Sequence, residues 1–215
     1  MVIFKKIKYI FFDFDGVIKE SVEIKTDAFE QLFLPFGIDI ARKIREHHEE
    51  NGGISRFEKL PIYLDWAGQY LSKQLISEYS EKFSWLVKQK VIDAPWVPGV
   101  LSYLQNNYKK QQFFLVTATP QQEIEYIICQ LKIEKYFRQV VGSPIGKIEA
   151  VNMLLNRYNI DLNQAVMVGD SSSDYDAAKQ NLISFILRKT KFNKNLQERL
   201  NCKIIEDFYD ELKKN

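Results

Sequence analysis

Short hydrophobic runs recur along the chain, and each ends at polar or small residues. Each run has the length and the β-branched or aromatic content of a fully buried strand. The runs cover residues 7–14, 113–117, 138–141, 165–168 and 183–187. Between the later runs, the spacing of hydrophobic positions predicts helices over residues 121–131, 147–158 and 173–180. This alternation predicts an α/β fold in which helices cover both faces of a parallel sheet.

The interval between the first and second predicted strands has a different pattern. Its hydrophobic spacing predicts helices alone, over residues 23–34, 40–50, 57–71 and 74–89. Asn51-Gly52-Gly53 is expected to end one of them in a left-handed turn. An interval this long far exceeds an ordinary strand-to-helix connection. We therefore expect a core domain made of residues 1–16 and 95–215, and a small all-helical domain, residues 17–94, inserted after the first strand.

Two carboxylates follow the first predicted strand, in Asp13-Phe14-Asp15-Gly16-Val17. Alternation along an extended chain places Asp13 and Asp15 on the same side, and Gly16 permits a sharp turn after them. Carboxylates this close repel each other, and a Mg²⁺ ion would remove the repulsion because it prefers oxygen ligands. A turn or a helix cap also explains aspartates at a strand end, so the pair alone leaves both interpretations open.

A second acidic pair, Asp170 and Asp174, follows the predicted strand over residues 165–168. Its spacing places both side chains on one face if a helix begins there, although acidic residues also favour helix N-termini as caps. The carboxyl ends of parallel strands share one edge of the sheet, so both acidic pairs would meet there. Carboxylates gathered in this way predict a site for a divalent cation.

Two further residues at the same edge suit an anion. Thr117 ends a predicted strand and precedes a helix, whose first N–H groups form an anion site. We expect Thr119 to cap that helix with Pro120 at its first position, which leaves Thr117 free. Lys147 begins another predicted helix, where a cation opposes the helix dipole unless an anion lies nearby. A bound phosphate would supply that anion, and a solvated lysine is the alternative.

Composition and charge narrow the class of protein. Of the 215 residues, 46% are hydrophobic and 27% are charged, which is an ordinary globular balance. The net charge of +2 is too close to neutral to indicate a nucleic-acid partner. The apolar run near the N-terminus is far too short to span a membrane. Cys129 and Cys202 are too few for a disulfide framework, and we expect both in or near the core. We therefore expect a soluble, cytoplasmic protein, either a monomer or a weak homodimer, with no nucleic-acid or membrane partner.

Together these segments resemble the motifs of the haloacid dehalogenase (HAD) superfamily of aspartate-nucleophile phosphotransferases. The resemblance rests on the segment from Asp13 to Val17, on Val116-Thr117, on Lys147, and on the segment from Gly169 to Asp174. These motifs occur in order across nearly the whole predicted core domain. The helical insertion is similar to the cap of the phosphoglycolate phosphatase and β-phosphoglucomutase branch. The resemblance implies a Rossmann-like fold of the HAD type with a helical cap.

The resemblance also implies roles for the acidic residues. Asp13 would be the nucleophile that forms an aspartyl phosphate. Asp15 would protonate the leaving oxygen and then deprotonate the attacking water. Mg²⁺ would be bound by Asp13, by the backbone carbonyl of Asp15 and by Asp170, with Asp174 as a further ligand or support.

Three other matched positions would bind the phosphoryl group. The resemblance implies that Thr117, the backbone N–H of Ala118 and Lys147 hold the phosphoryl oxygens. Neutralising and positioning these oxygens is the main task of a protein in phosphoryl transfer.

In the insertion, Gly53-Ile54-Ser55-Arg56 resembles the substrate-specificity loop of the β-phosphoglucomutase branch. Gly53 would then allow close approach, and Arg56 would offer a planar fork to a phosphate or carboxylate. A salt bridge from Arg56 to Glu49 or Glu58 is the alternative.

Three polar residues near the predicted cleft have no role assigned by the motifs. His47 and His48 are adjacent, so they point to different sides of their helix and indicate a polar helix end or a substrate rim rather than a metal site. Glu20 follows Asp15 closely, and we expect it near the cap hinge, facing the cleft.

The sequence favours a Mg²⁺-dependent phosphatase that acts on a small phosphorylated metabolite, either a sugar phosphate or a phosphoglycolate-like acid. A phosphosugar mutase is the first alternative. Against it, Gly52 replaces the Lys of the mutase loop, and Gly169 replaces the mutase-type Glu before the metal-binding Asp. A 2-haloacid dehalogenase needs neither Asp15 nor a metal cluster. A catalytically silent binding protein would not require the complete set of acidic residues.

Overall fold

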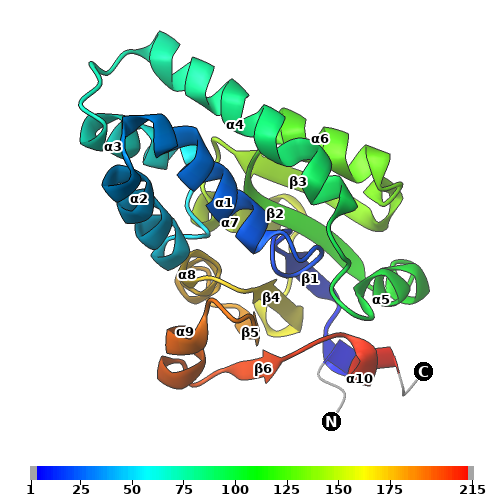
Figure 1. The fold of residues 1–215 in the computed structure, drawn as a ribbon. Helices are drawn as coiled ribbons and strands as arrows, with labels where there is room; N and C mark the ends of the chain where they lie inside the picture. Colours follow the sequence, from blue (N-terminus) through cyan, green and yellow to red (C-terminus); the bar gives the residue numbers. More distant parts are fainter. Residues whose placement is uncertain (1–3, 213–215) are drawn as a thin grey trace.

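A parallel sheet of six strands, in the order β3-β2-β1-β4-β5-β6, forms the centre of the computed structural model, which describes residues 4–212 (Figure 1). All five predicted strands are present, as is a sixth that the sequence pattern did not predict. The strands are β1 (Tyr9–Phe12), β2 (Gln112–Pro120), β3 (Phe137–Ser143), β4 (Ala165–Gly169), β5 (Ser184–Arg188) and β6 (Lys203–Ile205). The predicted α/β class is therefore confirmed.

Helices occupy the predicted intervals between the strands. Those of the segment between β1 and β2 are α1 (Val22–Phe33), α2 (Ile38–Glu50), α3 (Arg56–Trp66), α4 (Lys73–Asp93) and α5 (Val100–Asn107). Those that follow are α6 (Gln121–Gln130), α7 (Lys147–Arg157), α8 (Ser172–Gln180), α9 (Lys194–Arg199) and α10 (Tyr209–Leu212). Short 3₁₀ helices cover Phe4–Lys6, Leu34–Phe36, Glu134–Tyr136 and Leu162–Gln164.

Strand β1 is buried on both faces, as its continuous hydrophobic sequence predicts. Ile10 and Phe12 belong to a hydrophobic cluster that also includes residues of α5 and α6. Phe11 points the other way, into a second cluster with residues of α7 and α8. Helices therefore cover both sides of the sheet, and β1 pairs in parallel with β2 and β4, its neighbours on either side.

Helices α1 to α4 lie together above the edge of the sheet where β1 and β2 end (Figure 1). The chain enters this group just after β1 and leaves it before α5, and the two crossings are hydrogen bonded to each other. The Glu20 N–H donates to the Pro95 carbonyl at 2.9 Å, and the Val97 N–H donates to the Ile18 carbonyl at 3.1 Å. The division into domains at residues 16/17 and 94/95 stays a prediction.

Two expectations about local structure are wrong, and one strand was not predicted. Asn51 has a φ of −122°, and neither glycine after it is among the described residues with positive φ, so this helix does not end in a left-handed turn. Cys129 is exposed and Cys202 is half-buried. Strand β6 was not predicted because it is short and its first two residues, Lys203 and Ile204, are exposed, so its sequence carries little hydrophobic signal.

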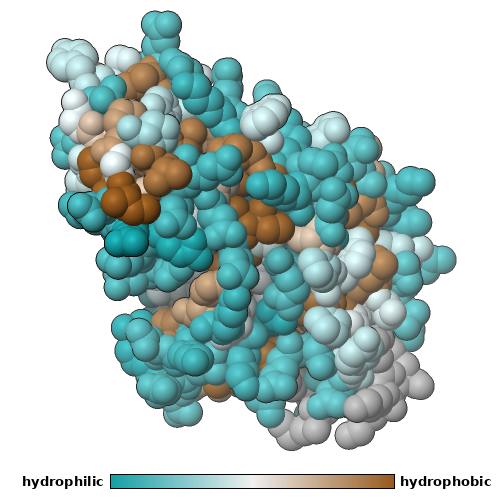
Figure 2. All heavy atoms as spheres, viewed as in Figure 1, coloured by the Kyte–Doolittle hydropathy of each residue, from teal (hydrophilic) through white to brown (hydrophobic). Residues whose placement is uncertain are grey.

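Hydrophilic side chains cover most of the face shown in Figure 2, and hydrophobic ones gather in its upper left, over the helical insertion. Leu34, Ile38 and Trp85 are among the exposed apolar residues of the insertion. No helix in the described part of the chain combines the length and hydrophobicity that crossing a membrane requires.

Phe208, near the C-terminus, is packed in the hydrophobic core. Shortening its side chain is therefore expected to lower the stability of the protein strongly. Its fully buried ring lies 6.1 Å from that of Phe12 and 5.6 Å from that of Tyr103, measured between centroids. We expect Phe208→Ala to lower the free energy of unfolding by about 3–5 kcal/mol, because it leaves a cavity among aromatic rings. The control Leu182→Ala, at a residue 78% exposed, should change it by less than about 0.5 kcal/mol. Urea unfolding compares the two, and equal losses would contradict the prediction.

Candidate active site

The carboxyl ends of three neighbouring strands, β2, β1 and β4, bring the predicted site residues together. Asp13 directly follows β1, and its N–H donates to the Val168 carbonyl of β4 at 3.0 Å. Asp170 directly follows β4, and Thr117 lies in the last part of β2. This hydrogen bond fixes the backbone of Asp13 relative to β4, the strand that leads to Asp170.

Lys147 lies between two of the carboxylates. Its Nζ is 2.8 Å from Asp13 Oδ2 and 2.7 Å from Asp174 Oδ1, and all three side chains are buried. Burial alone would lower the pKa of Lys147, but the charges of Asp13 and Asp174 outweigh it and raise the pKa above its usual value. The ammonium group at the first position of α7 is therefore held by carboxylates, which accounts for a cation at a helix N-terminus.

Negative charge in this cluster exceeds what Lys147 neutralises. One carboxylate oxygen from each of Asp13, Asp170 and Asp174 lies within 4.8 Å of the others. Burial and the neighbouring Asp174 raise the pKa of Asp13 to about 7, although Lys147 acts in the opposite direction. Burial, Asp13 and Asp174 also raise the pKa of Asp170 well above its usual value. Clustered oxygen donors with surplus negative charge fit a divalent cation such as Mg²⁺.

Two glycines leave space for the side chains of the carboxylate cluster. Gly16 has a φ of +71°, and a Cβ there would lie 2.3 Å from Asp170 Oδ2. A Cβ at Gly169 would lie 2.2 Å from the Cβ of Asp174. A glutamate at position 169, as in the mutase pattern, would therefore displace Asp174 from its present place.

The side chain of Asp15 lies outside the group of three clustered carboxylates and is held by a residue that the sequence reasoning missed. Lys25 of α1 forms an ion pair with Asp15 and donates to Thr119 Oγ1 at 2.8 Å, while Ser21 Oγ donates to Asp15 at 2.6 Å. Burial raises the pKa of Asp15, but Lys25 and Ser21 outweigh it, so the pKa lies below its usual value. A lysine inside the inserted segment carries no motif, so only the packing of α1 identifies it.

Thr119 does not cap α6 as expected. Pro120 occupies the cap position, and β2 extends through it, so Thr119 stays at the strand end and contacts Lys25. The buried Thr117 Oγ1 accepts a hydrogen bond from the Thr119 N–H at 3.2 Å, which leaves the Thr117 hydroxyl hydrogen available as a donor.

Gly53 lies where the insertion contacts the sheet domain. Its carbonyl accepts a hydrogen bond from Ser173 Oγ at 3.0 Å, and a Cβ at position 53 would lie within 2.2 Å of the Ser171 and Ser173 hydroxyls. Close approach is thus observed at Gly53, toward α8 of the sheet domain. A role in substrate binding stays a prediction.

Arg56 forms a buried salt bridge, and its partner is neither Glu49 nor Glu58. Its Nη2 is 2.5 Å from Glu123 Oε1 and its Nη1 is 3.0 Å from Glu123 Oε2, so the pair is bidentate. Arg56 begins α3 and Glu123 lies in the first turn of α6, so the contact joins the insertion to the sheet domain. Burial raises the pKa of Glu123, but Arg56 outweighs it and lowers the pKa below its usual value.

The three residues without an assigned role separate in the structure. His47 Nδ1 lies 3.0 Å from the Tyr63 hydroxyl, and His47 is not among the residues that line the site cavity. Glu20 is bonded to Arg188 and lines a different cavity, so it does not face the site cleft. His48 is buried, lies 2.9 Å from Lys59 Nζ through its Nδ1, and lines the site cavity.

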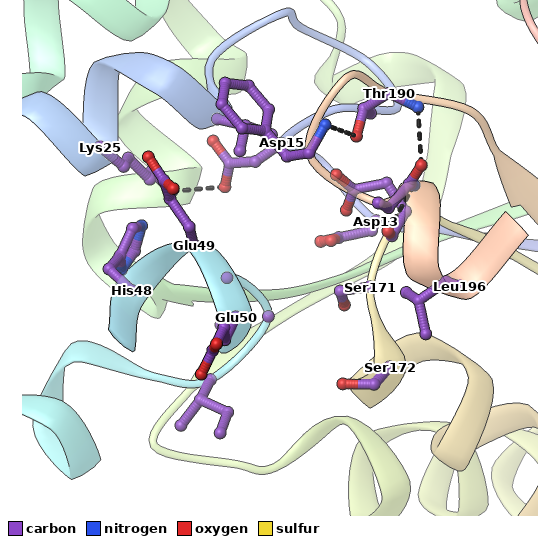
Figure 3. A pocket seen from close by; sticks show the side chains of 18 of the residues that line it. Asp13, Asp15, Lys25, His48, Glu49, Glu50, Ser171, Ser172, Thr190 and Leu196 are labelled. Atoms are coloured by element: carbon purple, nitrogen blue, oxygen red, sulfur yellow. Dashed lines mark hydrogen bonds and ion pairs between the residues drawn. The ribbon is translucent and has the colours of Figure 1, made fainter. Parts of the chain in front are cut away.

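A cavity of about 550 Å³ lies between the strand ends and the insertion (Figure 3). Its lining includes Asp13, Asp15, Ala118, Lys147 and Asp170 from the predicted core set, and Gly53 and Arg56 from the insertion. A volume of this size accommodates a small organic phosphate.

Comparison with known proteins identifies the family. The haloacid dehalogenase-like hydrolase family matches residues 10–187. A phosphorylated carbohydrates phosphatase of Thermotoga maritima is 26% identical over 182 residues, with 79% of each chain covered. A phosphoglycolate phosphatase of Pseudomonas savastanoi pv. phaseolicola is also 26% identical, over 80% of this chain and 65% of its own length. A crystal structure described as a predicted phosphoglycolate phosphatase from Haemophilus somnus has a TM-score of 0.73 and 18% identity, covering 97% of this chain and 98% of that one.

The chain belongs to the haloacid dehalogenase-like hydrolase family, because the family match covers most of its length. It is an enzyme of the phosphatase class, as the sequence predicted. The resemblance to the branch that includes phosphoglycolate phosphatases is confirmed as well.

The salt bridge between Arg56 and Glu123 predicts a large stability effect. The side chains of Arg56 and Glu123 are 4% and 5% exposed. We expect Glu123→Gln to lower the free energy of unfolding by about 3–5 kcal/mol, because it leaves a buried guanidinium without its counter-charge. Glu78→Gln, in a salt bridge to Lys82 that is 52% exposed on each side, should cost less than about 1 kcal/mol. Urea unfolding measures both, and similar losses would disprove the prediction.

Proposed function

We propose that this enzyme is a Mg²⁺-dependent phosphatase that hydrolyses a small phosphorylated metabolite through an aspartyl phosphate on Asp13. The observation that carries the proposal is the pair of contacts from Lys147 to Asp13 and Asp174 at the strand ends, where Asp170 adds a further carboxylate. The proposed nucleophile Asp13, the ammonium group of Lys147 and the proposed Mg²⁺ site then share one cavity.

Asp13 is suited to act as the nucleophile because its carboxylate is held from two sides. The Phe14 N–H donates to Oδ1 at 2.7 Å, and Lys147 donates to Oδ2. In the proposed first step, an Asp13 oxygen attacks phosphorus and the bond from phosphorus to the leaving oxygen breaks. Lys147 neutralises part of the charge that would keep an anionic phosphate away from a carboxylate.

Asp15 is proposed as the general acid and base. Its ionised form, favoured by Lys25, is the form that takes a proton from water in the second step, when the aspartyl phosphate is hydrolysed. In the first step the same carboxyl must carry a proton to the leaving oxygen, so Lys25 has to release it before that step.

The phosphoryl oxygens are proposed to contact Lys147, the Thr117 hydroxyl and the Ala118 N–H. The Thr117 hydroxyl has its hydrogen free to donate, because its oxygen accepts from Thr119. Ala118 lies in β2 and lines the same cavity as Asp13.

Mg²⁺ is proposed to be bound by Asp13, Asp170 and Asp174, with the backbone carbonyl of Asp15 as a further ligand. The clustered carboxylates and the raised pKa values of Asp13 and Asp170 support this assignment. When bound, the ion supplies positive charge that stabilises the transferring phosphoryl group.

The proposed substrate is a sugar phosphate or a phosphoglycolate-like acid, since relatives carry the names phosphorylated carbohydrates phosphatase and phosphoglycolate phosphatase. A mutase is less favoured because Gly169 has no room for a side chain beside Asp174. Gly53 and Arg56 are proposed substrate contacts of the insertion. Arg56 would have to exchange Glu123 for the anionic group of a substrate.

Removing the nucleophile tests the reaction. We expect Asp13→Asn to lower phosphate release from p-nitrophenyl phosphate by at least about 10³-fold, because the amide cannot form the acyl phosphate. Asp176→Asn, on the exposed side of α8, is the matched control and should keep its rate within about twofold. Release of phosphate by Asp13→Asn at the rate of the control would place the nucleophile elsewhere.

Removing a metal ligand tests the cation site. We expect EDTA to abolish phosphate release and added Mg²⁺ to restore it. Asp170→Asn should raise the Mg²⁺ concentration that gives half-maximal activity by about tenfold or more, because it removes one charged ligand. Mg²⁺ titration by calorimetry provides an independent measurement, and unchanged affinity in Asp170→Asn would remove Asp170 from the site.

A further inference from the structure

One peptide unit, that between Asp170 and Ser171, links the two acidic residues that follow β4. A peptide unit is planar, so its carbonyl and its N–H turn together and point in opposite directions. The N–H of this unit, on Ser171, donates to Asp174 Oδ2 at 3.1 Å. Its carbonyl, on Asp170, accepts a hydrogen bond from Asn193 Nδ2 at 2.7 Å. The plane is therefore held at both ends, by Asp174 on one side and by Asn193 on the other.

The carboxylate of Asp170 depends on this backbone for its position. Within residues 4–212 that carboxylate forms neither a hydrogen bond nor an ion pair. Before it, Gly169 pairs with Leu187 of β5 in the sheet. After it, the bond from Asn193 fixes the carbonyl. A carboxylate that is aimed by its backbone and has no protein partner remains available to a cation.

Asn193 uses its whole side-chain amide for contacts other than the usual one. It is the N-cap residue of α9, where Asn normally accepts from backbone N–H groups of the first turn, but its side chain makes no such bond. Besides the Asp170 carbonyl, Nδ2 donates to the Arg188 carbonyl at 2.9 Å. Oδ1 accepts from the Thr190 N–H at 2.9 Å and from Gln197 Nε2 at 2.7 Å. Carbonyls on one side and N–H groups on the other leave one orientation of this amide, which is 6% exposed.

The contact from Asn193 continues toward the proposed nucleophile. Asp174 accepts from Ser171 through Oδ2 and from Lys147 through Oδ1, and Lys147 also donates to Asp13. The segment that carries Asn193 forms part of the cavity wall, and Figure 3 shows Thr190 and Leu196 of this segment across the cavity from Glu49 and Glu50 of α2. A change at Asn193 is therefore expected to reach the carboxylate cluster through a continuous set of hydrogen bonds.

We propose that Asn193 is a positioning residue of the cation site, which holds the peptide unit after Asp170 so that the carboxylates of Asp170 and Asp174 face the same ion. The inference rests on the proposed function, because it assumes that Mg²⁺ binds at these carboxylates. It adds to that function a residue that belongs to none of the matched motifs. Removing a group that orients a metal ligand typically weakens metal binding by about 10- to 100-fold.

Mg²⁺ affinity tests the proposal without relying on turnover. We expect Asn193→Leu, which nearly keeps the volume and removes the amide, to raise the Kd for Mg²⁺ measured by calorimetry by about tenfold or more. Asn181→Leu is the matched control, since Asn181 is 7% exposed and its amide donates to the carbonyls of Ile148 and Ala177. Its Kd should stay within about twofold of the wild-type value. An unchanged Kd in Asn193→Leu, or an equal rise in both variants, would overturn the proposal.

Urea unfolding with and without Mg²⁺ separates positioning from a purely structural role. Both variants leave buried carbonyls without donors, so both should unfold at lower urea concentrations than the wild-type protein. An ion that binds only the folded protein raises the unfolding midpoint by an amount that depends on its Kd. At the same Mg²⁺ concentration, we expect a smaller rise for Asn193→Leu than for Asn181→Leu. Equal rises would mean that Asn193 supports the fold alone, and the proposal would fail.

The wild-type protein offers a measurement that needs no folded variant. Because coupling is reciprocal, a bond from Asn193 that favours Mg²⁺ binding must itself be stabilised by bound Mg²⁺. We expect saturating Mg²⁺ to slow hydrogen exchange of the Asn193 side-chain amide, followed by NMR, by about fivefold or more. The side-chain amide of Asn181 should change by less than about twofold. An Asn193 amide that exchanges equally fast with and without Mg²⁺ would contradict the proposed role.

The outcomes distinguish this inference from the proposed function. If the wild-type protein neither binds Mg²⁺ nor releases phosphate from p-nitrophenyl phosphate, the proposed function fails. If it does both and Asn193→Leu binds Mg²⁺ equally well, only the role of Asn193 is overturned. Since Asn193→Leu keeps every proposed ligand, saturating Mg²⁺ should return its kcat to within about threefold of the wild-type value. A kcat that stays low at saturating Mg²⁺ would show that Asn193 does not act through the cation site.

Discussion

Repulsion among buried and half-buried carboxylates at one edge of the sheet is the constraint on which the rest of the site depends. Asp13, Asp170 and Asp174 are drawn together by strand register and helix position, and Lys147 neutralises only part of their charge. The remaining negative charge makes the cluster attractive to a cation and raises the pKa values of Asp13 and Asp170. The fold therefore holds an arrangement that a bound cation would stabilise.

The helical insertion contributes charged and polar groups that contact residues of the sheet domain. Lys25 reaches down from α1 to Asp15, which separates this carboxylate electrostatically from the other three. Arg56 pairs with Glu123 of α6, and the Gly53 carbonyl accepts from Ser173 of α8. These contacts hold the insertion over the strand ends, so water has limited access to the carboxylates. Exclusion of water strengthens every electrostatic interaction inside such a site.

The sequence predicts those parts of the molecule that are marked by a continuous stretch of residues, such as a hydrophobic run. Asp13, Thr117 and Asp170 could be found because each follows a hydrophobic run that forms a strand, and parallel strands end at one edge. Lys25, Glu123 and Lys59 could not, because their partners are set by how separate helices pack, and a lysine or glutamate on a helix is usually solvated. Thr119 was misassigned for a related reason: hydrogen bonding to β3 extends β2 through Pro120, and this overrides the local preference of threonine for a helix cap.

The two chain crossings between the sheet and the insertion have a mechanical consequence. Asp15 forms an isolated backbone β-bridge with Lys19, and Lys19 forms another with Trp96. Asp15 therefore belongs to the paired backbone segments where the chain crosses between the sheet and the insertion. Asp13, two residues earlier, is instead anchored to β4 through its own N–H. If the insertion moved about these crossings, Asp15, the proposed general acid and base, would move with it, whereas Asp13, the proposed nucleophile, would stay with β4.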